Sequence, residues 1–336
     1  MTRRVAAIDC GTNSIRLLIA ETRSTANDSE RSRGSSHPDQ PSPATLADLT
    51  REMRIVRLGE GVDRTGRLSG AALDRTMVAL REYAGLIAGA GPEAIRMVAT
   101  SATRDAANSR EFTDRVVEVL GIAPEVITGD EEAWLSFTGA TRELAGTPLA
   151  EGPCPAPCLV TDIGGGSTEF IVGDSAGIAG ARSVNIGCVR LTERHLPGDP
   201  PAPREVAAAV ADIDAALDLV AAGIPAASAR TLIGLAGSVT TVAAIALGLD
   251  GYDPVRIHHA RVPAERVREI AGELLAMTRA ERAAIPAMHP GRVDVIGAGA
   301  LILDRIMTRL RFTEVLVSEH DILDGIAWSV LSPAVG

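Results

Sequence analysis

The sequence contains no lysine, so all 33 of its basic residues are arginine. This absence excludes the phosphate-loop NTPases, because their glycine-rich loop needs a lysine on the β- and γ-phosphates. Long hydrophobic runs are also missing. The longest apolar stretch, residues 235–249, is interrupted by a serine and two threonines. It is shorter than the ~20 residues that a membrane span requires, so we expect no membrane partner.

Cysteine is scarce as well. Four cysteines in 336 residues do not form the dense pattern of a disulfide framework. Cys154 and Cys158 flank the residues PAP, but no second pair of metal ligands is near in the sequence, so we expect reduced thiols rather than a zinc site. Only four apolar residues separate Arg4 from Asp9, too few for the core of a secretory signal, which predicts a cytoplasmic protein.

The formal net charge is −10. General nucleic-acid binders and membrane-surface binders carry a basic footprint, so this balance predicts that neither is a partner.

The length predicts two domains, and strands alternate with helices, which indicates an α/β layer structure. Residues 24–48 are rich in Ser, Pro, Asp and Gly, and we interpret them as a mobile insertion. We expect a strand-turn-strand hairpin over 5–20 and a second one that follows a Pro/Gly-rich connector at 145–158. Further strands are expected at 94–100, 231–237 and 314–319, and helices at 69–91 (with Ser69 as N-cap), 105–120, 131–144, 203–222, 240–248, 263–278, 293–310 and 321–331.

The turns of the two hairpins share one motif, DCGTNS at 9–14 and DIGGGS at 162–167. Small residues let backbone N–H groups approach an anion without side-chain obstruction, and each closing serine adds a hydroxyl donor. A phosphate beside Asp9 and Asp162 would be repelled unless a cation lay between them. Magnesium, held by one or two carboxylates, phosphate oxygens and water, is the natural candidate.

Glu131 and Glu132 open a helix shortly before the second motif. Acidic residues in the first turn of a helix commonly compensate the helix dipole, and this role explains one of the two glutamates well. A further carboxylate in a cleft lined by Asp9, Asp162 and Glu169 would orient or deprotonate a water for attack on phosphorus. Paired phosphate loops would serve a kinase, an ATPase or a phosphohydrolase.

Six motifs follow one another along the chain: IDCGTNSIRLLIAE, RLGEGVDRTGRLS, ATSATRDA, TGDEEA, DIGGGSTEF and NIGCVRLTE. In these motifs and their order the chain resembles, over essentially its whole length, the exopolyphosphatase/guanosine pentaphosphate phosphohydrolase (Ppx/GppA) family of the actin, Hsp70 and sugar-kinase superfamily. This resemblance implies an α/β fold of two similar actin-like (ribonuclease H-like) domains, with mixed sheets flanked by helices and the active-site cleft between them. Domain I would comprise residues 1–128 plus about 318–336, and domain II residues 129–317. A homodimer is also implied.

The resemblance implies a role for each site residue. Glu132 is the catalytic glutamate. The metal residues are Asp9, Asp162 and Glu169. The residues that bind substrate phosphate are Gly11, Thr12, Asn13, Ser14, Arg104, Gly164, Gly165, Gly166 and Ser167. Two positions depart from the family: Trp134 stands where arginine is frequent, and Thr12 replaces a serine while it keeps the hydroxyl.

These features predict a hydrolase that removes the terminal phosphoryl group of inorganic polyphosphate with Mg²⁺, or with Mn²⁺, and with a monovalent cation as a further option. Arginines of residues 51–67 would guide the rest of the polyphosphate. Guanosine pentaphosphate 5′-phosphohydrolase activity is the close alternative, although eight Trp, Tyr and Phe side chains offer little for stacking on a purine. A kinase is a further alternative, but this chain has no recognisable motif for binding a phosphoryl acceptor. A non-catalytic sensor of guanosine penta- or tetraphosphate is another, and the presence of Glu132, Asp162 and Glu169 argues against it.

Overall fold

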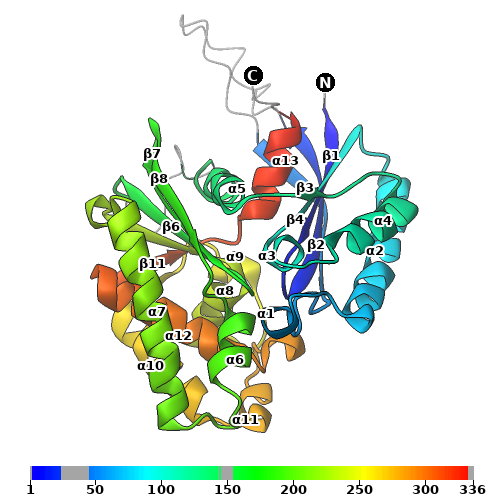
Figure 1. The fold of residues 1–336 in the computed structure, drawn as a ribbon. Coiled ribbons are helices and arrows are strands. Elements are labelled where there is room, and N and C mark those ends of the chain that lie inside the picture. The colour runs from blue at the N-terminus through cyan, green and yellow to red at the C-terminus, as the bar shows by residue number, and fades with distance from the viewer. Residues whose placement is uncertain (1, 24–44, 143, 145–153, 332–336) are drawn as a thin grey trace, which may run out of the picture.

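The computed structural model describes residues 2–23, 45–142, 144 and 154–331, and Figure 1 shows two sheets side by side, each with helices against it. The first sheet has the strand order β3-β2-β1-β4-β5 and the second the order β10-β11-β9-β6-β7-β8. The strands of the first sheet are β1 (Arg4–Cys10), β2 (Ser14–Arg23), β3 (Thr45–Ile55), β4 (Ala94–Ala99) and β5 (Glu125–Val126). Those of the second are β6 (Cys158–Ile163), β7 (Thr168–Asp174), β8 (Gly177–Val184), β9 (Thr231–Leu235), β10 (Arg261–Pro263) and β11 (Glu314–Val317).

The two sheets share one topology. In each, a hairpin (β1-β2 or β6-β7) is extended by an antiparallel third strand (β3 or β8) and pairs on its other side with a parallel strand (β4 or β9). A further parallel strand follows in both, β5 in the first sheet and β11 in the second. The mixed sheets flanked by helices confirm the predicted α/β class, and the repeated order agrees with the repeated hairpin motif.

Longer helices cover the sheets: α2 (Gly70–Ala90), α4 (Ser109–Leu120), α5 (Gly129–Thr141), α6 (Cys188–His195), α7 (Pro203–Gly223), α8 (Ala236–Ala246), α10 (Ala264–Ala276), α12 (Ile296–Leu310) and α13 (Ile322–Leu331). Short helical turns are α1 (Val62–Thr65), α3 (Ser101–Arg104), α9 (Pro254–Ile257), α11 (Arg279–Ala283), η1 (Ala226–Ser228) and η2 (Pro290–Arg292). In the described part of the chain, none of the helices has the length and apolar character that a membrane crossing needs.

Both faces of each central strand are buried, which explains the apolar runs at 5–8 in β1 and 158–160 in β6. In β1, Ala6 and Ile8 face the core under α2 and α4, whereas Val5 and Ala7 face α13. Helix α5 lies between the sheets, where Leu135 joins the core of the first and Phe137 that of the second. Figure 1 shows α5 and α13 at this junction. The helix that carries Glu131 and Glu132 in its first turn therefore contacts both halves of the molecule.

Four sequence predictions need correction. Helix α8 begins at Ala236 rather than at residue 240, because β9 ends at Leu235 and the helix follows it directly. The insertion was expected to end at residue 48, but β3 begins at Thr45, because residues 45–48 pair with β2; residues 24–44 lie outside the described residues. Helix α4 begins at Ser109 rather than near 105, since the Asn108 side chain bonds both backbone groups of Leu68 and so lies outside the helix. Helix α5 begins at Gly129 rather than at Glu131, because Thr128 caps it. The predicted cap of α2 is confirmed, with Ser69 Oγ accepting from the amide of Ala72 at 3.2 Å.

Candidate active site

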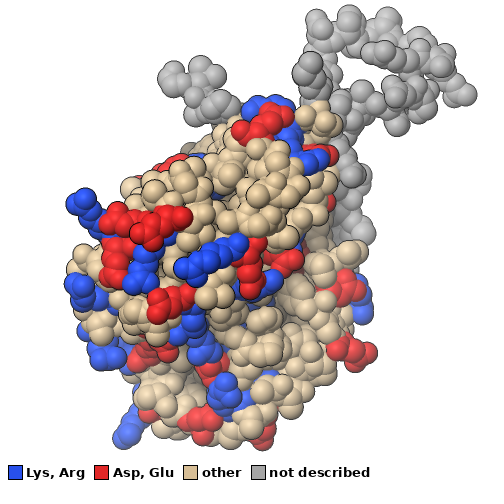
Figure 2. Space-filling model, turned by 90° about the vertical axis from the view of Figure 1, so that its right-hand side faces the viewer, with Lys and Arg blue, Asp and Glu red and all other residues tan. Residues whose placement is uncertain are grey.

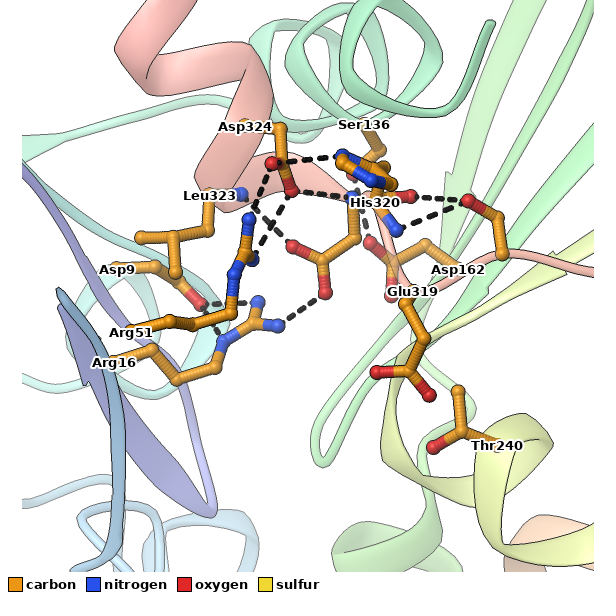
Figure 3. A network of polar contacts seen from close by, with 12 residues as sticks. Asp9, Arg16, Arg51, Ser136, Asp162, Thr240, Glu319, His320, Leu323 and Asp324 are labelled. Carbon is orange, nitrogen blue, oxygen red and sulfur yellow. Dashed lines mark hydrogen bonds and ion pairs between the residues drawn. The ribbon is translucent and has the colours of Figure 1, made fainter. Parts of the chain in front are cut away.

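The first hairpin places Asp9 at the next-to-last position of β1, close to its turn. The turn is closed by the Gly11 amide, which donates to the Ser14 carbonyl at 3.0 Å. Asp9 lies opposite Arg16 in the register of β1 and β2. The Arg16 guanidinium donates to Asp9 Oδ2 through Nε at 3.0 Å and Nη2 at 2.6 Å, as Figure 3 shows, and it also contacts Asp321, which lies just before α13. The negative charge of Asp9 is thus already paired.

The second hairpin repeats this geometry with the opposite charge. Asp162 is the next-to-last residue of β6 and lies opposite Glu169, at the position that Arg16 occupies in the first hairpin. Neutral hydroxyls support these two acids: Ser136 Oγ donates to Asp162 Oδ2 at 2.7 Å and Ser183 Oγ to Glu169 Oε1 at 2.7 Å. Hydroxyl donors leave the charge uncompensated. The second hairpin therefore carries the negative side of the site.

The two turns touch each other, which explains their small residues. A Cβ on Gly165 would lie 2.9 Å from Thr12 Cβ, and one on Gly166 would lie 2.6 Å from Ser101 Oγ. Thr12 Oγ1 and Ser101 Oγ are themselves 2.8 Å apart. A side chain at either glycine would force the turns apart, so the close approach requires glycine here.

Helix α6 orients the amides of the second turn. The carbonyl oxygens of residues 164 and 165 accept from the first backbone amides of α6 at 2.9–3.1 Å, and that of Gly166 accepts from Arg190 Nε at 2.7 Å. In a planar trans peptide the N–H points opposite to the C=O, so the N–H groups of residues 165–167 point away from α6. Gly165 and Ser167 line the cleft between the sheets. The turn thus presents successive donors to that cleft, as an anion site requires.

Glu132 lies in the first turn of α5 and is 8% exposed. Arg104 Nη1 donates to its Oε2 at 3.1 Å and to the carbonyl of Ile127 at 2.9 Å, which fixes the carboxylate relative to the first sheet. Glu131 instead forms a surface ion pair with Arg96 at 2.7 Å. The structure separates the two glutamates, since one is buried at the cleft and the other is outside it.

Buried negative charge concentrates around Glu132. Burial, and then the charge of Glu169, raise the pKa of Glu132 well above its usual range despite the opposing effect of Arg104. Burial, followed by the charge of Asp162, raises the pKa of Glu169 to about 8. Burial and the charge of Asp321 raise the pKa of Asp162 to about 6. Such carboxyl groups are costly to ionise unless a cation joins them.

The donor set fits magnesium bound partly through water and phosphate. Oδ1 of Asp9 is buried, lines the cleft and has no hydrogen-bond partner, so it is available as a metal ligand. Among the described residues, no group of three or more His, Cys, Asp or Glu side chains could hold a metal ion by itself. Mg²⁺ usually keeps several waters and takes only one or two carboxylates beside substrate phosphates, so this arrangement suits it.

The cleft brings ten of the thirteen predicted site residues together around a volume of about 100 Å³. They are Asp9, Gly11, Thr12, Asn13, Ser14, Glu132, Asp162, Gly164, Gly165 and Ser167. Three do not line it. Arg104 contacts Glu132, Gly166 packs against Thr12 and Ser101, and Glu169 is buried beside Ser183.

Four further residues were missed by the sequence analysis. Arg16, Ser101 and Arg292 line the cleft, and Ser136 supports Asp162. One signal was present for Arg16, which follows Asp9 by the same spacing as Glu169 follows Asp162. The others come from segments remote from either hairpin.

A second cavity of about 390 Å³ continues from the cleft and shares Arg16, Gly237 and Arg292 with it. Arg51 lines this cavity too and pairs with Asp324 at 2.5 Å (Figure 3). Two other arginines of the predicted guiding cluster are also paired with acids, Arg54 with Glu52 and Glu82 and Arg57 with Asp294. The surface agrees with this pairing, since Figure 2 shows arginines interspersed with acidic side chains over the described part of one face.

Comparison with known proteins gives the family. The model of the Ppx/GppA phosphatase family matches residues 38–333. The chain belongs to this family. It is 47% identical over 336 aligned positions to exopolyphosphatase 2 of Mycobacterium tuberculosis, which covers 97% of this chain and 98% of that protein. The crystal structure of an exopolyphosphatase-like protein superimposes with a TM-score of 0.87 at 41% identity and covers 98% of both chains.

A more distant relative carries another name. Guanosine-5′-triphosphate,3′-diphosphate pyrophosphatase of Aeromonas salmonicida is 28% identical over 326 aligned positions, which cover 97% of this chain and 59% of that protein. The Ppx/GppA family makes this chain a phosphatase, and the resemblance inferred from the motifs is confirmed.

Proposed function

We propose that this Ppx/GppA phosphatase is an exopolyphosphatase that hydrolyses the terminal phosphoryl group of inorganic polyphosphate. The observation that carries the proposal is that the two turns, of which the second presents amides to the cleft, meet beside the buried Glu132, at the mouth of a cavity lined by Arg16, Arg51 and Arg292. The first part suits a terminal phosphate, and the arginines suit the phosphates that follow it. The full-length relative named exopolyphosphatase 2 supports the same substrate.

The turns would bind the terminal phosphoryl group. Amides of residues 165–167 and the hydroxyls of Thr12 and Ser167 would donate to its non-bridging oxygens, where charge is held in the transition state. Arg292 would contact the next phosphate along the substrate, because it lines both the cleft and the second cavity. In this role backbone donors and arginine replace the lysine that the sequence lacks.

Glu132 would accept the proton of the attacking water. The water oxygen forms a bond to the terminal phosphorus while the bond from phosphorus to the bridging oxygen breaks, and that oxygen leaves on the shortened polyphosphate. Arg104 positions the Glu132 carboxylate through its 3.1 Å contact. Phosphoryl transfer to water needs little beyond such positioning and charge neutralisation.

Of the three predicted metal residues, Asp9 and Asp162 would bind magnesium directly, beside water and substrate oxygens. Glu169, which is buried behind the cleft, would add its charge to that of Asp162. When bound, the ion supplies charge neutralisation between the acids and the phosphoryl oxygens. The same oxygen ligands would also bind manganese. The second hairpin, which lacks an internal arginine, is the side that gains most from a cation.

Guanosine pentaphosphate is the second candidate substrate. Tyr252, Met53 and Met288 line the second cavity and offer apolar contacts that a purine could use. The pyrophosphatase of Aeromonas salmonicida is a relative in keeping with this alternative. A non-catalytic sensor of guanosine penta- or tetraphosphate is the third, and it would bind without turnover.

One comparison separates these candidates. Phosphate release is measured with Mg²⁺ from short polyphosphate, long polyphosphate, guanosine pentaphosphate and ATP at equal concentrations of terminal phosphate. Fast release from polyphosphate supports the proposal. Release from guanosine pentaphosphate alone assigns the second function, and binding of that nucleotide without release from any substrate assigns the sensor.

Two features stay predictions. The division into residues 1–128 plus about 318–336 and residues 129–317 is consistent with α13, which follows β11 of the second sheet but packs on β1 of the first. The homodimer would be tested by light scattering of the purified full chain.

A further inference from the structure

Cys154 and Cys158 form a pair of thiols at the start of β6. Their Sγ atoms lie 3.5 Å apart, which is contact distance and longer than the about 2.05 Å of a disulfide, so both are free thiols in this structure. Cys154 is partly exposed, whereas Cys158 is buried at 8% exposure. One thiol is therefore accessible, and a second is held against it.

The surroundings make Cys154 the reactive member. A hydrogen bond from Cys158 lowers the pKa of Cys154 to about 6, helped by Thr231 and by the charge of Arg261. Since the thiolate is the nucleophile, the lowered pKa favours Cys154 as the attacking member of the pair. Among the described residues, no group of three or more His, Cys, Asp or Glu side chains that could hold a metal ion is found at the pair.

A groove gives small molecules access to both sulfurs. It has a volume of about 590 Å³ and is lined by both cysteines together with Trp134 and Phe137 of α5. Trp134 is 45% exposed, so this end of the groove is open. The groove is separate from the phosphate cleft, since the two share no lining residue.

We propose that Cys154 and Cys158 are a peroxide-reactive dithiol that forms a reversible disulfide within the chain. The Cys154 thiolate attacks one oxygen of hydrogen peroxide, so that a sulfur–oxygen bond forms, the oxygen–oxygen bond breaks and hydroxide leaves. The product is a sulfenic acid. The Cys158 thiol then attacks this sulfur: the disulfide bond forms, the sulfur–oxygen bond breaks, and the hydroxyl leaves as water with the Cys158 proton. A small dithiol reductant returns both thiols.

The other two cysteines are internal controls. Cys10 and Cys188 are 1% and 5% exposed, and burial raises the pKa of each thiol. Because the chain has arginine but no lysine, trypsin releases residues 5–16 with Cys10, 143–182 with Cys154 and Cys158, and 183–190 with Cys188. The candidate pair is thus read in one peptide and each control in another.

The test exposes the full-length protein to hydrogen peroxide, blocks the remaining thiols with iodoacetamide after denaturation and measures the three tryptic peptides by mass spectrometry. We expect peptide 143–182 to lose both alkylation sites, with an internal disulfide that dithiothreitol reverses. Its loss of thiol is expected to be about tenfold or more faster than in peptides 5–16 and 183–190, because only Cys154 is both accessible and largely ionised. In Cys158→Ser, Cys154 should stop at the sulfenic acid, which dimedone traps.

Several outcomes would overturn the proposal. They are peptide 143–182 remaining fully alkylated, loss of thiol at equal rates in all three peptides, and a disulfide that joins two chains. The wild-type arm decides these outcomes by itself, so the conclusion does not depend on whether a serine variant folds.

Discussion

Two glycines allow α5 to pack closely against α13, and replacing one of them tests the packing that positions Glu132. A Cβ on Gly139 of α5 would lie 1.8 Å from the carbonyl oxygen of Asp321, and a Cβ on Gly325 of α13 would lie 2.0 Å from that of Leu135. Both obstacles are backbone atoms, which cannot rotate aside. Gly139→Ala therefore forces the two helices apart.

The magnitude follows from this distance. Ordinary carbon–oxygen contacts begin near 3.3 Å, so one helix must retreat by about 1.5 Å. Overpacking typically lowers the free energy of unfolding by about 1–3 kcal/mol. We expect about 3 kcal/mol here, because the clash is between the backbones of two helices. Alanine's better helix propensity returns at most about 1 kcal/mol. We expect the free energy of unfolding to fall by about 2–3 kcal/mol. Activity should fall as well, because the displaced Asp321 contacts Arg16.

The assay is urea unfolding followed by circular dichroism, with Gly85→Ala as the matched control. Gly85 lies in the middle of α2, is exposed and has open space where a Cβ would be, so alanine there should stabilise the protein by up to about 1 kcal/mol. If Gly139→Ala unfolded within about 0.5 kcal/mol of the wild type, the close packing of α5 on α13 would be refuted.

Two further predictions concern buried charges. The substitution Arg16→Met removes the ion-pair partner of Asp9. We expect kcat/KM for phosphate release to fall about 100-fold or more, because an uncompensated buried charge disorders the site. Full activity would contradict the role of this pair. Asp324 is 1% exposed, and although burial alone would raise its pKa, Arg51 and His320 hold the pKa well below its usual range. Asp324→Asn should therefore lower the free energy of unfolding at pH 7 by about 3 kcal/mol. This is the low end of the range for a broken buried ion pair, because the Arg51 side chain is one-third exposed. A depressed pKa stabilises the fold above the unfolded value of about 3.9, so the difference from the wild type should shrink as the pH falls below 4 in urea titrations. A difference that is constant with pH would refute this.

Local patterns predicted much of the architecture. The repeated motif at Asp9 and Asp162 predicted two hairpins, and the structure has them with matching registers and matching strand order. Helical spacing with a cap predicted α2 closely. These features depend on neighbours in the sequence, where periodicity and turn chemistry carry the information.

Contacts between remote segments could not be predicted in the same way. Arg16 and Asp321 are separated by most of the chain, and nothing near either of them signals the pair. The same holds for the support that α6 gives to Gly166 through Arg190. Glu132 could be separated from Glu131 by resemblance, but its burial and its contact with Arg104 required the fold. The sequence therefore predicted the candidate site residues, while the side chains that contact and position them required the structure.

The most direct test of the account is phosphate release from polyphosphate by Glu132→Gln beside Glu131→Gln. The two substitutions remove the same charge from adjacent residues of one helix, but only Glu132 is buried at the cleft, whereas Glu131 pairs with Arg96 at the surface. We predict that Glu132→Gln loses about 100-fold or more in kcat, as expected for a missing general base, while Glu131→Gln stays within about threefold of the wild type. Full turnover by Glu132→Gln, or equal losses in both variants, would contradict the central role of Glu132.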